Sequence, residues 1–172
     1  MVKIAISGLT GTGKTTTAER IAGELDIPHI CFSMKEEARA RGISIVDLQS
    51  IAAEDDNIDK EFDRRQGEEM ERHSSFITST WLGPWFANAD LNVWLYAEDS
   101  VRARRVAERD GLSYEEAFKM MIVKDKQNNE RYLKLYGINI ADINKFHVCI
   151  NTSNMPVEKV CSVVTSVLGI MR

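Results

Sequence analysis

Residues 8 to 15 have the residue types and spacing of a phosphate-binding loop. The segment reads Gly-Leu-Thr-Gly-Thr-Gly-Lys-Thr and matches G-x-x-x-x-G-K-[S/T] at every fixed position. Glycines let the backbone take positive φ and bring its N–H groups close to an anion. The Lys14 ammonium can reach the β- and γ-phosphates of a nucleotide, and the Thr15 hydroxyl can ligate Mg²⁺. The segment therefore predicts a site for ATP and Mg²⁺.

The elements around this segment are the ones that a phosphate-binding loop needs. Residues 2–7 form a mostly apolar run typical of a strand, and residues 15–25 have a helical pattern whose N-terminus faces the phosphates. The residues expected to contact the nucleotide are Gly8, Thr10, Gly11, Thr12, Gly13, Lys14, Thr15 and Thr16.

Strands and helices alternate along the rest of the chain. Further strands are predicted at 28–32, 75–79, 91–97 and 147–151, with helical segments between them. This alternation predicts a three-layer α/β fold, a five-stranded parallel sheet with helices on both faces. No linker divides the 172 residues, so residues 1–172 are expected to form one domain built around the phosphate-binding loop.

The composition indicates a protein of the cytoplasm. Apolar residues make up 44% of the chain and charged residues 28%, with a net charge of −4. An acidic chain disfavours a nucleic acid polymer or an anionic membrane as the main partner. Three cysteines without a C-x-x-C spacing are typical of reduced thiols, and no apolar stretch reaches the length of a membrane span.

Cations after the fourth predicted strand favour a kinase over other users of such a loop. A GTPase needs a base-reading N-K-x-D, and residues 151–154 read Asn-Thr-Ser-Asn instead. Arg109 ends one charged helix, and Lys124 and Arg131 lie seven residues apart on the next. A lid at residues 109–135 would bring these cations onto the charge that develops during phosphoryl transfer. The alternative is that they cover solvated helix faces.

Nearly the whole chain resembles the archaeal-type cytidylate kinases. The most specific block is Arg-Tyr-Leu-Lys-Leu-Tyr-Gly-Ile-Asn-Ile at 131–140, followed by Asn-Thr-Ser at 151–153. Residues 59–66, 89–95 and 111–117 also fit the family. The resemblance implies transfer of the γ-phosphoryl group of ATP to a nucleoside monophosphate such as CMP or dCMP. It also implies positive charge from Arg109 and Arg131 over the phosphates, and a monomer.

The resemblance fails at the acceptor side. Where the family has Glu-Gly-Arg at the end of the third strand, this chain has Ser79-Thr80-Trp81. Serine lacks the carboxylate charge, and tryptophan cannot bind a phosphate through a bidentate contact. In the alignment with the family, Lys35 and Lys124 stand in for arginines, and Asn128 stands in for an acidic residue that fixes the acceptor.

The sequence leaves two roles possible for other residues of the predicted acceptor flap, residues 34–73. Asp59 and Asp63 lie four residues apart and could bind acceptor hydroxyls or pair with Lys60 and Arg64. Arg64 or Arg65 could also replace a missing phosphate contact.

The two tryptophans Trp81 and Trp85 suit either a pocket that stacks a ring or simple core packing. Three hypotheses follow from these departures. The protein is a variant cytidylate kinase, a kinase for a different or modified nucleotide or other small acceptor, or a non-catalytic ATP-binding regulatory protein.

Overall fold

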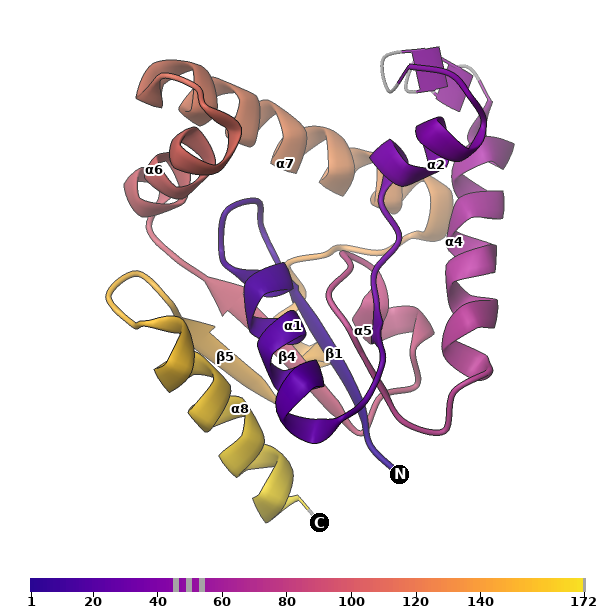
Figure 1. The fold of residues 1–172 in the computed structure, drawn as a ribbon. Helices are drawn as coiled ribbons and strands as arrows, with labels where there is room; N and C mark the ends of the chain where they lie inside the picture. Colours follow the sequence, from indigo (N-terminus) through magenta and orange to yellow (C-terminus); the bar gives the residue numbers. More distant parts are fainter. Residues whose placement is uncertain (45–46, 49–50, 53–54, 172) are drawn as a thin grey trace.

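The computed structural model describes residues 1–44, 47–48, 51–52 and 55–171. Five strands and their connecting helices are arranged around one sheet (Figure 1). In chain order the elements are β1 (Lys3–Gly8), α1 (Lys14–Leu25), β2 (His29–Ile30), α2 (Met34–Ala40), α4 (Asp56–Glu71), β3 (Phe76–Thr78), α5 (Gly83–Phe86), β4 (Leu91–Tyr96), α6 (Asp99–Asp110), α7 (Tyr114–Tyr136), η1 (Ile143–Lys145), β5 (Val148–Asn151) and α8 (Val157–Ile170).

The sheet has the order β2-β3-β1-β4-β5, and every pair of neighbouring strands is parallel. The predicted five-stranded parallel sheet is thus confirmed. β1 lies at the centre, with Ile4 paired to Ile77 on one side and Leu91 on the other. Because the strands are parallel, their carboxyl ends share one edge, where ligands bind in open α/β sheets.

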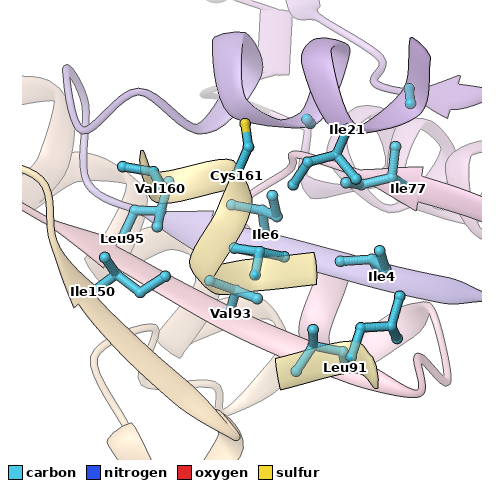
Figure 2. Packing of buried hydrophobic residues seen from close by; sticks show 14 residues of the cluster. Ile4, Ile6, Ile21, Ile77, Leu91, Val93, Leu95, Ile150, Val160 and Cys161 are labelled. Atoms are coloured by element: carbon cyan, nitrogen blue, oxygen red, sulfur yellow. The ribbon is translucent and has the colours of Figure 1, made fainter. Parts of the chain in front are cut away.

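Helices α1 and α8 cover one face of the sheet. Figure 2 shows Ile4 and Ile6 of β1 beneath Ile21 of α1 and Cys161 of α8, all almost fully buried. The near-continuous apolar sequence of the strands is typical of a parallel sheet that is covered on both faces. This packing fixes the direction of β1 and α1, and so the position of the loop between them.

The opposite face carries two short elements that the sequence pattern did not predict, α5 and η1. α5 packs tightly on β1, because a Cβ on Gly83 would lie 2.9 Å from Thr78 Cγ2 and 3.6 Å from the Ala5 Cβ. Met70 of α4 and Phe76 of β3 form a small core on this face, beside a second one built on Leu82 and Tyr132.

α6 and α7 form a helical hairpin above the carboxyl edge of the sheet (Figure 1). Gly111 ends α6 in the left-handed region with a φ of 67°. Ser113 begins α7 with the capping box that its sequence predicts, and Gly137 ends it. Within the described residues, no helix is both long and apolar enough to cross a bilayer.

Candidate active site

A large cleft of about 1880 Å³ lies at the carboxyl edge of the sheet. The loop after β1 forms its floor, and residues of α4, α6 and α7 form its walls (Figure 1). All the predicted nucleotide-contacting residues from Thr10 to Thr16 line this cleft. Gly8 does not; it ends β1 and packs against the Leu95 carbonyl oxygen.

The glycines of the loop are required by its backbone. Gly11 has a φ of 79°, and a Cβ there would lie 2.7 Å from the Arg102 carbonyl oxygen. Gly13 has a φ of 92° and is the N-cap of α1. Its neighbour Lys14 begins the helix, so the positive end of the α1 dipole faces the cleft. The geometry provides an anion-binding loop of the kind that the motif predicts.

Arg102 and Asp125 hold the loop from behind. Arg102 is 2% exposed, and its Nη1 donates to the Thr10 carbonyl oxygen at 2.9 Å and to Asp125 Oδ2 at 2.6 Å. Asp125 Oδ1 accepts from the Thr10 N–H at 3.0 Å. No local pattern predicts this role of Asp125, because it depends on α7 crossing over the loop.

Thr152, just after β5, supports the other half of the loop. Its Oγ1 donates to the Thr12 carbonyl oxygen at 3.0 Å. Arg105 donates to the Thr152 carbonyl oxygen at 2.6 Å. The Asn-Thr-Ser block that carries part of the family resemblance is therefore a structural support of the phosphate-binding loop.

Lys14 is folded back on its own loop. Its Nζ donates to the Leu9 carbonyl oxygen at 2.8 Å and lies 4.9 Å from the centre of the Trp81 ring. Desolvation lowers the pKa of Lys14 to about 7, although the Asp125 carboxylate opposes this shift. An anionic phosphate beside the ammonium would favour its charged form.

The three predicted lid cations all line the same cleft: Arg109, Lys124 and Arg131. Arg109 is half exposed and forms an ion pair with Asp110 at 2.6 Å. Burial lowers the pKa of Lys124, and the charges of Arg109 and Arg131 lower it further. Lys124 therefore lies close enough to both arginines to be repelled by them, an arrangement that a polyanion such as a triphosphate would relieve.

Arg131 is held by neighbours on two helices. Its Nη1 lies 3.2 Å from Asp59 Oδ1 on α4, and its Nη2 donates to Asn128 Oδ1 at 2.9 Å on α7. Asn128 itself is buried at the edge of the cleft. The acceptor contact predicted for Asn128 stays a prediction, with its amide oxygen already used by Arg131.

Asp63 lines the cleft from α4 and accepts a hydrogen bond from the Tyr136 hydroxyl at 2.7 Å. Burial raises the pKa of Asp63 to about 6, and the hydrogen bond from Tyr136 opposes that shift. The alternative pairing of Asp59 and Asp63 with Lys60 and Arg64 is wrong. Both carboxylates instead contact α7, which the spacing within one helix could not reveal.

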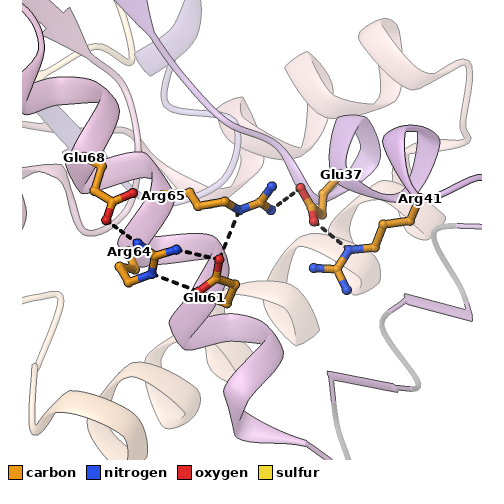
Figure 3. Close-up of polar contacts among 6 residues, drawn as sticks. All are labelled: Glu37, Arg41, Glu61, Arg64, Arg65 and Glu68. Carbon is orange, nitrogen blue, oxygen red and sulfur yellow. Dashed lines mark hydrogen bonds and ion pairs between the residues drawn. The ribbon is translucent and has the colours of Figure 1, made fainter.

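Arg64 does not reach the cleft. It forms ion pairs with Glu61 and Glu68 on the exposed face of α4, as Figure 3 shows. The predicted acceptor contact by Arg64 is therefore not supported. The side chain of Lys35, the other predicted substitute, lies outside the described residues.

The segment after β3 gives the two tryptophans different roles. Trp81 lines the cleft beside Lys14, whereas Trp85 packs edge-to-face against Phe146 with ring centres 5.8 Å apart. The prediction that Trp85 stacks on the ring of a ligand is thus wrong. Ser79, at the position of the missing strand-end carboxylate, lies with its Oγ 2.9 Å from His29 Nε2. Burial lowers the pKa of His29, which favours its neutral form.

A nucleotide-bound Mg²⁺ fits the donors that are present. Thr15 lines the cleft in the first turn of α1 and offers one hydroxyl oxygen. Mg²⁺ commonly takes one or two protein ligands and completes its shell with phosphate oxygens and water. The described residues contain no group of three or more His, Cys, Asp or Glu that could hold a metal without a nucleotide.

The chain is similar to kinases in sequence and in fold. A family model described as the cytidylate kinase-like family matches residues 3–154. The cytidylate kinase of Pyrococcus horikoshii is 38% identical over 167 residues, which cover 96% of this chain and 87% of that protein. The cytidylate kinase of Methanobrevibacter smithii is 32% identical over 170 residues, with 98% and 99% covered.

Solved structures share the fold at low sequence identity. An uncharacterized protein from Eubacterium ventriosum has a TM-score of 0.74 at 18% identity, with 98% of this chain and 99% of that chain covered. A shikimate kinase from Bacteroides thetaiotaomicron has a TM-score of 0.61 at 19% identity, with 98% of each chain covered. These structures show the fold alone, whereas the family model and the sequence relatives show that the chain belongs to the cytidylate kinase-like family.

Proposed function

We propose that this protein transfers the γ-phosphoryl group of ATP to a nucleoside monophosphate, with CMP or dCMP as the acceptor. The observation that carries the proposal is one cleft that is lined both by Lys14 of the loop and by three cations of the α6–α7 hairpin. The chain is a phosphotransferase of the nucleoside monophosphate kinase class by family, and the curated relatives are named cytidylate kinase. We also propose that it acts as a cytoplasmic monomer.

The donor binds along the loop. Backbone N–H groups from Gly11 to Thr15 and the α1 dipole hold its phosphates, and Thr16 contacts the α-phosphate. Lys14 leaves the Leu9 carbonyl for the β- and γ-phosphates. Thr15 would hold Mg²⁺, which when bound neutralises charge on the phosphate oxygens.

Transfer depends on position and charge. The acceptor phosphate oxygen forms a bond to the γ-phosphorus while the bond from that phosphorus to the β-bridging oxygen breaks. Residues 109–135 act as a lid that brings Arg109, Lys124 and Arg131 onto the transferred group. Closing also excludes water, which would otherwise accept the phosphoryl group.

The acceptor enters between the flap, residues 34–73, and the segment after β3. Asp63 and Gln66 line this side of the cleft. Asp63 is suited to bind hydroxyl or amino groups of the acceptor, because its Oδ1 is available beside the Tyr136 contact at Oδ2.

A second candidate is a kinase for a modified nucleotide or another small acceptor. The observation that favours it is the pair of replacements at the end of β3, where Ser79 and Trp81 stand in place of a carboxylate and an arginine. A non-catalytic ATP-binding protein would share these replacements, but it would have no use for three cations over the γ-phosphate.

The test is ADP release from ATP and Mg²⁺ against CMP, dCMP, UMP, AMP, GMP, dTMP, modified nucleotides, nucleosides and a blank. Stimulation by CMP or dCMP is expected, and Lys14→Ala serves as the matched inactive control. Stimulation by another acceptor alone would establish the second candidate. Binding of ATP without stimulation by any acceptor would contradict a kinase function.

A further inference from the structure

The ion pair between Arg131 and Asp59 joins the proposed lid to the proposed flap. Arg131 belongs to α7 and lines the cleft, whereas Asp59 belongs to α4 and is 4% exposed. Their closest atoms, Nη1 and Oδ1, are 3.2 Å apart. A buried carboxylate thus sets the place of a cation that faces the nucleotide site.

Each side chain of this ion pair also has a polar atom without a partner. Asp59 Oδ2 and Arg131 Nε are both buried, and neither has a hydrogen-bond partner among the described residues. Two parallel bonds to a carboxylate come from Nη1 and Nη2 or from Nε and Nη2, so Nε and Nη1 cannot both bind Asp59. Since buried polar groups are rarely left unpaired, the contact favours a turn of the guanidinium that brings Nε to Asp59 Oδ2.

Two neighbouring contacts between the same helices lack these properties. Lys134 pairs with Asp56 at 2.8 Å, but both side chains are exposed, so solvent screens the pair. Tyr136 donates to Asp63 through a neutral hydroxyl group, so this contact involves no charged side chain of α7. The Tyr132 ring, 5.4 Å from the Arg131 guanidinium, packs beside the pair. Only the Asp59 contact therefore acts on a proposed catalytic cation.

We propose that Asp59 is a positioning residue that acts through Arg131. Entry of the acceptor moves α4, the Nε edge of Arg131 turns to Asp59, and Nη1 is released toward the γ-phosphate. The contact thereby links occupancy of the acceptor side to the charge that stabilises transfer. This inference rests on the proposed function, because it assigns a role to one of that function's cations.

The first test compares Asp59→Asn with Asp56→Asn, which removes the exposed carboxylate of the same helix pair. We expect kcat to fall between about tenfold and hundredfold in Asp59→Asn, because the guanidinium loses its orientation. The Kd for ATP should change by less than about twofold, since the phosphate-binding loop is untouched. Asp56→Asn should keep the wild-type kcat. An unchanged kcat in Asp59→Asn would overturn the inference.

The second test is a double-mutant cycle with Arg131→Met, which separates positioning from general destabilisation. If Asp59 acts through Arg131, Asp59→Asn causes no further loss of kcat in the Arg131→Met background. The same loss in both backgrounds would overturn the inference. Should Asp59→Asn alone fail to fold, the double variant buries no unpaired charge, and its kcat against that of Arg131→Met decides in the same way.

Failure of the proposed function would be seen separately. If the proposed function is wrong, the wild-type protein forms no CDP. The Asp59 cycle is measured as ADP release, with whichever acceptor supports it or by hydrolysis alone, so its outcome depends only on the ratios among variants.

Discussion

The donor and acceptor sides of the cleft are held by different kinds of contact. On the donor side, Arg102, Asp125 and Thr152 bind backbone groups of the loop from behind and are themselves buried. On the acceptor side, α4 contacts the rest of the site through side chains, among them Asp59 and Asp63, while its outer face carries exposed ion pairs (Figure 3).

This difference shows which half of such a site can diverge. A loop that binds phosphate with its backbone depends on glycines and on buried supports, and few substitutions are compatible with it. A surface made of side chains can change residue by residue without loss of the fold. The departures that the family resemblance implies, at Ser79 and Trp81, belong to the proposed acceptor side.

Removing Lys14 should have the largest effect on activity. In Lys14→Ala we expect phosphoryl transfer to fall by about 10²–10³-fold or more, because the main cation on the β- and γ-phosphates is lost. The variant should be no less stable than the wild-type protein, because burial opposes the charged form of the ammonium and lowers its pKa to about 7. Steady-state kinetics and thermal unfolding measure the two effects. Wild-type rates in this variant would show that the loop does not bind the donor.

Breaking one ion pair on each side should separate the two halves in stability. Arg102→Met leaves the Asp125 carboxylate buried without its cation, and we expect a loss of about 3–5 kcal/mol in the free energy of unfolding. The matched change on the exposed face of α4, Arg64→Met, should leave the free energy of unfolding nearly unchanged, because solvent screens exposed ion pairs. Urea denaturation gives both values. Equal losses of unfolding free energy would mean that the ion pairs on the two sides do not differ in how much they stabilise the fold.

Two glycines of the loop provide a sharper comparison within the donor side. Both Gly11→Ala and Gly13→Ala force alanine into a left-handed backbone, which costs about 1–2 kcal/mol. Only at Gly11 would the new Cβ also meet backbone, 2.7 Å from the Arg102 carbonyl oxygen, whereas nothing lies within 4 Å at Gly13. We therefore expect Gly11→Ala to lose about 1–3 kcal/mol more. Similar denaturation midpoints for the two variants would contradict the tight support of the loop by α6.

The smallest effect is expected at Asp63, on the acceptor side. Its pKa is raised from 3.8 to about 6, so the folded protein binds the proton more tightly than the unfolded chain. The free energy of unfolding should therefore fall by about 2 kcal/mol as the pH rises from about 4 to about 6. Asp63→Asn should lack this fall, being more stable than wild type at pH 7.5 and equal to it near pH 4. A variant that is less stable at pH 7.5 would show that the carboxylate is favourably placed.

The sequence predicted the features that depend on neighbours along the chain. The loop from Gly8 to Thr15, the five strands and the capping box at Ser113 all follow from local spacing. The small elements α5 and η1 were missed because neither has a repeating pattern; α5 depends on the close packing of Gly83 against Thr78 of β3.

Contacts between distant helices could not be predicted. Nothing in the spacing of Asp59 and Asp63 indicates that they would turn to Arg131 and Tyr136 and away from Lys60 and Arg64. The placement of Arg64 on the outer face of α4 depends on which side of that helix meets α7. These contacts determine where the side chains of the proposed acceptor side lie. The donor side was therefore easier to predict from the sequence.

The most direct measurement follows the γ-phosphoryl group itself. The protein is incubated with CMP, Mg²⁺ and ATP labelled on its γ-phosphate, and the products are separated, with Lys14→Ala as the control. The label is expected in CDP with the wild-type protein and to remain in ATP with the variant. Label found only in inorganic phosphate, or in no product at all, would contradict phosphoryl transfer to this acceptor.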